Sequence, residues 1–135
     1  VFGGTQMRPH LHMQDMVDLY ALLLEVPDDV IAGQIFNAGY QNYSVAETAE
    51  RIREVVMQVM PEKRDVPVVT TPSDDRRSYH LSSQKIQQRL GFIPRHTIED
   101  AVRDLVRAFR AGKLPDSLND VRYSNIQMMK SIHLT

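Results

Sequence analysis

Cysteine is absent from the 135 residues of this chain. Its absence excludes disulfide frameworks, thiolate metal sites and cysteine nucleophiles. A charge excess of either sign is also missing, because 16 basic and 17 acidic residues leave a formal net charge of −1. Without a basic field we expect binding neither to nucleic acid nor to an anionic membrane surface. Any anion that binds must therefore be held by a few well-placed cations.

Long hydrophobic runs and glycine-rich turns are lacking as well. The longest strongly apolar stretch covers residues 20–24, which is far too short to span a membrane. The six glycines, at positions 3, 4, 33, 39, 91 and 112, form no G-x-G-x-x-G dinucleotide turn and no P-loop. None of the five tyrosines has a lysine four residues later, so a Tyr/Lys pair on one helix face is absent. The sequence offers neither a dinucleotide site nor a catalytic Tyr–Lys pair.

The chain has the composition of one globular domain, with 42% hydrophobic and 24% charged residues. Its first residues, Val1–Gly4, contain no secretory leader and no initiator methionine, and they have the pattern of a turn between two strands. We therefore interpret residues 1–135 as a single domain that is a fragment of a longer protein, and we expect a cytoplasmic location.

Alternation of helical and extended patterns predicts an α/β fold with a small sheet of few short strands flanked by helices. Asp15 is the predicted N-cap of the first helix, and Ser44 with Glu47 forms a capping box at the start of the clearest helix. The predicted helices cover residues 16–24, 45–59, 84–90 and 98–111, with a weaker one in 119–135, and the predicted strands cover residues 11–13, 34–38 and 66–70.

Three polar residues near the start of the chain are candidate metal ligands. His10 and His12 would share one face of an extended segment, and Asp15 follows closely. A further ligand and a second shell are missing, so the pattern favours histidines that hold a turn or the core. We expect no metal site.

Arginines at two places are candidate phosphate ligands. Arg8 precedes a predicted strand, while Arg76 and Arg77 follow another in a loop of the kind where ligands gather on α/β sheets. The planar fork of arginine suits diphosphate oxygens. Judged by the residues alone, solvated arginines or ion pairs with Asp74 and Asp75 are the commoner outcome.

Four segments, in this order, resemble the NAD-dependent epimerase/dehydratase family of extended short-chain dehydrogenases. The first, residues 8–16, is similar to the family's R-x-x-x-H-x-x-D segment, and the second, Gly33–Gly39, is similar to its G-x-x-[FY]-N-x-G strand. Ser44–Glu47 resembles the capped helix that follows. Residues 82–94 resemble the S/D-x-x-K-I…L-G-[FW]-x-P ending, which a last helix opening at Thr97 completes. Each segment is weak by itself, but four in the right order cover almost the whole chain.

The resemblance implies a C-terminal, substrate-binding portion of an extended Rossmann-type enzyme. Arg8 corresponds to an arginine that contacts the diphosphate of a nucleotide sugar, and the 71–79 loop supplies Asp75 and Tyr79 near the nucleotide. The family's loop arginine lies about three residues before this aspartate, where this chain has Pro72. We expect Arg77, with Arg76 beside it, to take its place.

The resemblance also implies what the fragment lacks. Family members transfer a hydride from the sugar to bound NAD or NADP with the help of a Tyr-Lys pair, all of which would lie upstream in the missing N-terminal Rossmann half. We therefore expect no catalytic residue, no cofactor site and no turnover in this chain, and NAD or NADP only in the intact parent. The motifs are shared by epimerases, dehydratases, decarboxylases and reductases.

Two further interpretations concern the partners. Any homodimer of the fragment would form through the apolar face of residues 16–24. The alternative to a nucleotide-sugar-binding part is a non-enzymatic α/β regulatory or protein-interaction module, which accounts equally for the missing motifs but not for the four segments arriving in family order.

Overall fold

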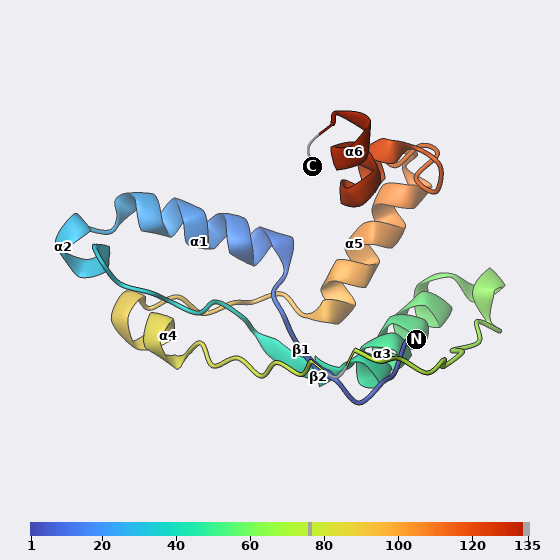
Figure 1. Cartoon of the computed structure of the whole chain (residues 1–135), viewed down its shortest axis with the longest axis horizontal. Helices are drawn as coiled ribbons and strands as arrows, with labels where there is room; N and C mark the ends of the chain where they lie inside the picture. Colours follow the sequence, from blue (N-terminus) through green and yellow to red (C-terminus); the bar gives the residue numbers. More distant parts are fainter. Residues whose placement is uncertain (76, 134–135) are drawn as a thin grey trace. The chain divides into compact units, whose positions relative to one another are not determined.

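The computed structural model describes residues 1–75 and 77–133, and the chain divides into two compact units, residues 1–104 and 105–135. The first unit contains β1 (Met7–His10), α1 (Met13–Glu25), α2 (Asp28–Ile31), β2 (Gln41–Ser44), α3 (Val45–Val59), the 3₁₀ helix η1 (Pro61–Lys63), α4 (Gln84–Leu90) and the start of α5 (Ile98–Arg110) (Figure 1). The second unit contains the rest of α5, the 3₁₀ helix η2 (Val121–Tyr123) and α6 (Asn125–Ser131). The predicted α/β fold with a small sheet is confirmed. No helix in the described ranges is long and apolar enough to cross a membrane.

The sheet consists of β1 and β2, which pair antiparallel with Arg8 opposite Tyr43. The strand predicted over residues 11–13 is wrong, because β1 ends before it and α1 begins within it. The strands predicted over residues 34–38 and 66–70 are wrong as well, since both segments are irregular. A short apolar run does not reveal whether a neighbouring backbone is present to complete a ladder.

The start of α1 differs from the prediction. His12, not Asp15, is the N-cap, and its Nδ1 accepts the backbone N–H of Gln14 at 3.0 Å. Asp15 lies in the first turn and is 2% exposed. The side chain that was expected to serve its own helix is therefore available for a distant segment.

The predicted capping box at Ser44 is confirmed. Ser44 Oγ accepts the backbone N–H of Glu47 at 3.1 Å, and the Glu47 carboxylate accepts that of Ser44 at 2.8 Å. Thr97 and Asp100 exchange the equivalent pair of bonds at the start of α5. α4 ends at Gly91, whose φ of +68° is the left-handed conformation that favours glycine.

The core of the first unit joins α1 to α4. Leu19, Ile86 and Phe92 form its buried centre, and Ile86 is only 1% exposed. The partly buried residues around it are Met16, Leu22, Leu23, Phe36, Ala38 and Leu90. Ser83 Oγ ties the start of α4 to the segment before β2 by bonding both N–H and C=O of Gly39 at 2.7 Å. This packing fixes the two segments that flank the sheet.

Candidate functional site

Arg8 lies within β1, and its side chain is 30% exposed. Its Nη1 donates to the carbonyl oxygens of Met7 and Arg77, and its Nη2 lies 3.5 Å from Oδ2 of Asp75. The guanidinium is therefore held at the junction between the strand and the loop of residues 71–79.

That loop is fastened to the free side of β1 by backbone and side-chain bonds. The backbone N–H of Tyr79 donates to the carbonyl of Met7, and the Met7 N–H donates to Ser78 Oγ, both at 3.0 Å. Gln6 Nε2 donates to the carbonyl of Asp75 at 3.0 Å. These contacts place the loop beside Arg8 although about 70 residues separate them in sequence.

Asp75 lies between two guanidinium groups. Arg77 donates to its carboxylate through Nε at 2.8 Å, Nη2 at 2.9 Å and the backbone N–H at 3.1 Å. The hydrogen bonds from Arg77, with the nearby charge of Arg8, hold the pKa of Asp75 well below its usual range. The Arg8 guanidinium also lies 5.5 Å from the ring centroid of Tyr79. Four of the five predicted residues are thus brought together; the fifth, Arg76, lies outside the described residues.

This arginine cluster, which consists of Arg8, Asp75, Arg77 and Tyr79, faces solvent. The Arg77 side chain is 73% exposed and Tyr79 is 52% exposed. Two guanidinium groups and one carboxylate leave a local excess of positive charge, and arginine forks bind phosphate oxygens in pairs. The arrangement can hold an anion, but it contains no activated nucleophile or general base.

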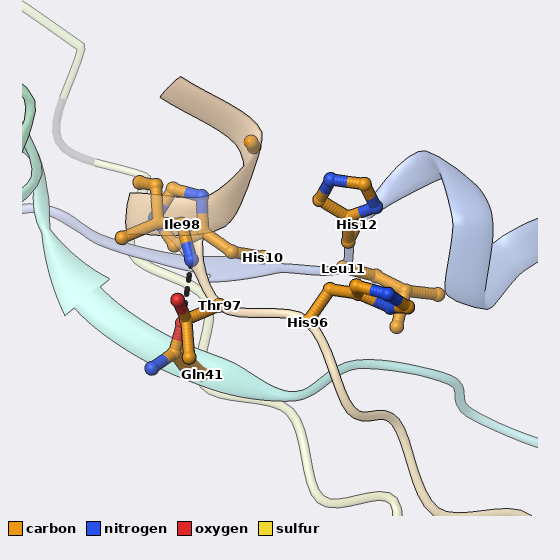
Figure 2. Close-up of a pocket in the computed structure, with 8 residues that line it drawn as sticks. His10, Leu11, His12, Gln41, His96, Thr97 and Ile98 are labelled. Atoms are coloured by element: carbon orange, nitrogen blue, oxygen red, sulfur yellow. Dashed lines mark hydrogen bonds between the residues drawn. The ribbon is translucent and has the colours of Figure 1, made fainter. Parts of the chain in front are cut away.

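A second group of polar residues surrounds a hollow of about 100 Å³ in the first unit (Figure 2). Its lining consists of His10, Leu11, His12, Gln41, His96, Thr97, Ile98 and Ala101. The dashed line in Figure 2 marks the bond in which the backbone N–H of Ile98 donates to Oε1 of Gln41 at 3.0 Å, joining β2 to the start of α5. The two strands β1 and β2 and the start of α5 therefore meet at this hollow.

Asp15 of α1 binds the segment that carries His96, one of the residues lining the hollow. Its carboxylate accepts the backbone N–H groups of Arg95 and His96 at 3.0 to 3.2 Å and lies 2.7 Å from Nδ1 of the His96 ring. Burial by itself would raise the pKa of Asp15, but the bonds from His96 and Arg95 outweigh it and lower the pKa. The bond to Asp15 raises the pKa of His96. Sequence reasoning missed His96, because 81 residues separate the partners and no local pattern marks them.

Within the described ranges no group of three or more histidine, cysteine, aspartate or glutamate residues is arranged to hold a metal ion. His10 Nε2 lies 3.1 Å from Thr48 Oγ1 and His12 serves as a helix cap, so both have structural partners.

The chain is similar to known enzymes over part of their length. No family model matches it. It is 33% identical over 104 residues to a UDP-glucose 4-epimerase from Corynebacterium glutamicum, an alignment that covers 73% of this chain and 30% of that protein. The chain thus spans about a third of the length of this curated relative.

The chain also matches about a third of the length of several solved structures. The PbgP3 protein from Burkholderia pseudomallei is 29% identical with a TM-score of 0.63, over 82% of this chain and 34% of that one. RMD from Pseudomonas aeruginosa, complexed with NADPH, has a TM-score of 0.62 at 22% identity, over 82% of this chain and 35% of that one. L-threonine dehydrogenase from Clostridium difficile has a TM-score of 0.60 at 18% identity, over 82% and 34%. The last two are similar in fold alone.

Proposed function

This chain belongs to the NAD-dependent epimerase/dehydratase family of extended short-chain dehydrogenases, and from that premise we propose that it is the nucleotide-sugar-binding, C-terminal part of such an enzyme. The observation that carries the proposal is the convergence of Arg8 on the loop that holds Asp75, Arg77 and Tyr79. UDP-glucose is the substrate named for the curated relative, so a UDP-sugar is the substrate to test first.

The cluster suits a diphosphate linked to a ribose. Arg8 and Arg77 would bind the diphosphate oxygens, because their planar donors match phosphate geometry and carry permanent charge. Asp75 holds the Arg77 side chain in place while leaving it largely exposed, and its carboxylate would accept the hydroxyl groups of the ribose. Tyr79, which lies beside Arg8, would contact the nucleotide.

Catalysis would belong to the rest of the parent protein. The sequence has no dinucleotide turn and no Tyr-x-x-x-Lys pair. The intact parent would bind NAD or NADP in its N-terminal Rossmann half and oxidise the sugar there. The 135-residue chain alone would bind no NAD and turn over no substrate, which calorimetric titration with NAD tests directly.

The exposed face of α1 would dock against that missing half. Met13, Val17, Tyr20 and Leu24 lie on one side of the helix at spacings of four, three and four, and they are 74%, 52%, 61% and 89% exposed. An apolar stripe of this kind marks an interaction surface. Without the Rossmann half, the stripe would drive self-association of the chain.

Sedimentation velocity tests the role of the stripe. Leu24→Gln should weaken any self-association, whereas Leu118→Gln, a matched change at a leucine that is 97% exposed in the second unit, should not. Equal behaviour of the two variants would exclude the α1 face as the contact.

A nuclear magnetic resonance titration with UDP and UMP tests the substrate site. UDP should shift signals of Arg8 and residues 74–79 and should bind about tenfold more tightly than UMP, because only UDP has the second phosphate for the arginine pair. Arg8→Ala should abolish that difference. Identical shifts with both nucleotides, or none near these residues, would favour the non-enzymatic module instead.

The chain contains a matched control for Arg77. Arg122 also donates through Nε and Nη2 to a carboxylate two residues earlier, that of Asp120, and its side chain is 69% exposed against 73% for Arg77. Arg77→Ala should weaken UDP binding about tenfold, while Arg122→Ala should leave it unchanged. Equal losses would mean that only general positive charge matters.

A further inference from the structure

His12 is held in its neutral form by the contacts of its two ring nitrogens. Nδ1 accepts the backbone N–H of Gln14 at 3.0 Å, so this nitrogen must keep its lone pair. Nε2 lies 3.5 Å from Oδ2 of Asp104 and therefore carries the proton. The side chain is 8% exposed, which leaves it little access to alternative partners in solvent. The cap of α1 thus requires one particular neutral tautomer.

His96 is in the opposite situation. Its Nδ1 must carry a proton, because it lies 2.7 Å from the carboxylate of Asp15. That carboxylate is buried, and its other bonds come from the backbone N–H groups of Arg95 and His96. A buried carboxylate needs a compensating charge, so Asp15 favours the charged form of His96, consistent with the raised pKa of that ring.

The two rings are stacked against each other. Their centroids are 4.8 Å apart and their planes differ by 28°. In Figure 2 the His12 ring lies above the His96 ring. A charged imidazole on a neutral one is an attractive pair, whereas two charged rings at this distance repel each other. Geometry therefore favours a mixed state, in which one ring is charged and the other is not.

We propose that His12, His96 and Asp15 form a pH-sensitive clasp that joins the start of α1 to residues 95–96 and is complete only while His96 is charged and His12 is neutral. The clasp lies outside the arginine cluster and operates whether or not a nucleotide is bound. It fastens the chain that leaves β1 only a few residues after Arg8, so its opening would loosen the strand that carries this arginine.

The charges around the clasp come from four elements. They are Asp15 and Asp18 of α1, Asp100 and Asp104 of α5, His10 of β1 and Arg95 of the segment before α5. The carboxylates of Asp15, Asp100 and Asp18 all favour charge on His96. The side chain of Asp104 is 48% exposed, so solvent screens its charge, whereas the cap of α1 requires the Nδ1 lone pair of His12.

The two contacts depend on pH in opposite directions. A charge whose pKa is raised in the folded state contributes fully at low pH and is lost as the pH rises through the raised value, so the His96–Asp15 contact weakens on the alkaline side. Protonation of His12 at Nδ1 removes the cap and adds a second positive charge beside His96 and at a helix N-terminus. This contact therefore weakens on the acidic side. The fraction of molecules in which both contacts are formed should therefore depend on pH as a bell-shaped curve.

Hydrogen exchange measured by NMR on the 135-residue chain tests the clasp, after correction for intrinsic rates. The amide of Gln14 reports the cap and should lose about fivefold in protection between pH 7.5 and 5.5. The amide of His96 reports the bond to Asp15 and should lose protection as the pH rises through the raised pKa of that ring. His12→Asn retains a good cap that does not titrate, so it should remove only the acidic limb. His96→Gln retains a neutral donor and should remove only the alkaline limb.

His80→Gln is the matched control, because His80 is an exposed histidine outside the clasp, and both limbs should persist in this variant. The clasp is refuted if the acidic limb survives in His12→Asn or disappears in His80→Gln. Nitrogen chemical shifts of the wild-type imidazoles give a test that needs no variant. They should show Nδ1 of His12 unprotonated while the cap is formed, and His96 keeping its charge to a pH above the ordinary imidazole pKa. A protonated Nδ1 on His12 in the capped state would overturn the proposal.

Discussion

Replacement of Asp15 by asparagine should be one of the most damaging conservative changes in the chain. Asp15 is 2% exposed, and both of its oxygens accept donors: Arg95 and His96 through their backbone, and His96 through its ring. Asparagine has the same shape, but one of its two acceptors becomes an NH₂ group that faces N–H donors. At least one buried donor is left unpaired, which costs about 1–3 kcal/mol, and the charge-assisted character of the remaining bonds is lost.

We expect Asp15→Asn to lower the free energy of unfolding by about 2–4 kcal/mol, a large part of the roughly 5–15 kcal/mol typical of a domain. Urea unfolding followed by far-ultraviolet circular dichroism measures the change. Asp18→Asn is the matched control, since Asp18 lies on the same helix, is exposed and accepts a hydrogen bond from the side chain of Gln14 at 2.8 Å. Its effect should stay within about 0.5 kcal/mol. Equal midpoints for the two variants would refute the view that Asp15 ties α1 to residues 95–96.

Four further outcomes follow from the packing, the caps and the charges. Ile86→Ala should cost about 2–4 kcal/mol in urea unfolding, while Ile93→Ala, at a side chain that is 57% exposed, should cost far less. Gly91→Ala should cost about 1–2 kcal/mol by calorimetry, because alanine is strained at a φ of +68° although no atom lies within 4 Å of its Cβ. Ser44→Ala should cost about 1 kcal/mol through loss of the α3 cap, and Ser44→Asn should restore most of it. The pKa of Asp15 is lowered in the folded state, so the ionised carboxylate contributes to the free energy of unfolding above about pH 4 and this contribution is lost as the pH falls below that. The difference in stability between wild type and Asp15→Asn should therefore narrow when urea unfolding is repeated at pH 3.

The helices were the most predictable part of the fold. α4 begins and ends where the pattern of residues 84–90 predicts, and the capping box at Ser44 places the start of α3 at the right residue. Both signals are local, since a cap and its partner lie within one helical turn. The strand predictions over residues 34–38 and 66–70 were wrong for the converse reason. A strand needs a backbone partner elsewhere in the chain, and an apolar run of five residues carries no information about that partner.

Of the candidate site, the sequence predicted the members but not all of their contacts. It singled out Arg8, Asp75 and Tyr79 through their likeness to family motifs and Arg77 as the replacement for the family's loop arginine. The structure brings these residues together. The pairing of both arginines with one carboxylate is a matter of loop geometry. Their role towards a nucleotide remains a prediction for the UDP titration.

By itself, the sequence determined the bounds of α3 and α4, the α/β class and the absence of dinucleotide and Tyr–Lys motifs, because these depend on spacing along a few turns of chain. Only the tertiary structure decided that His12, not Asp15, caps α1 and that Asp15 binds residues 95 and 96 instead. A buried carboxylate takes whichever donors the fold carries to it, and donors about 80 residues away have no signature in the neighbouring sequence.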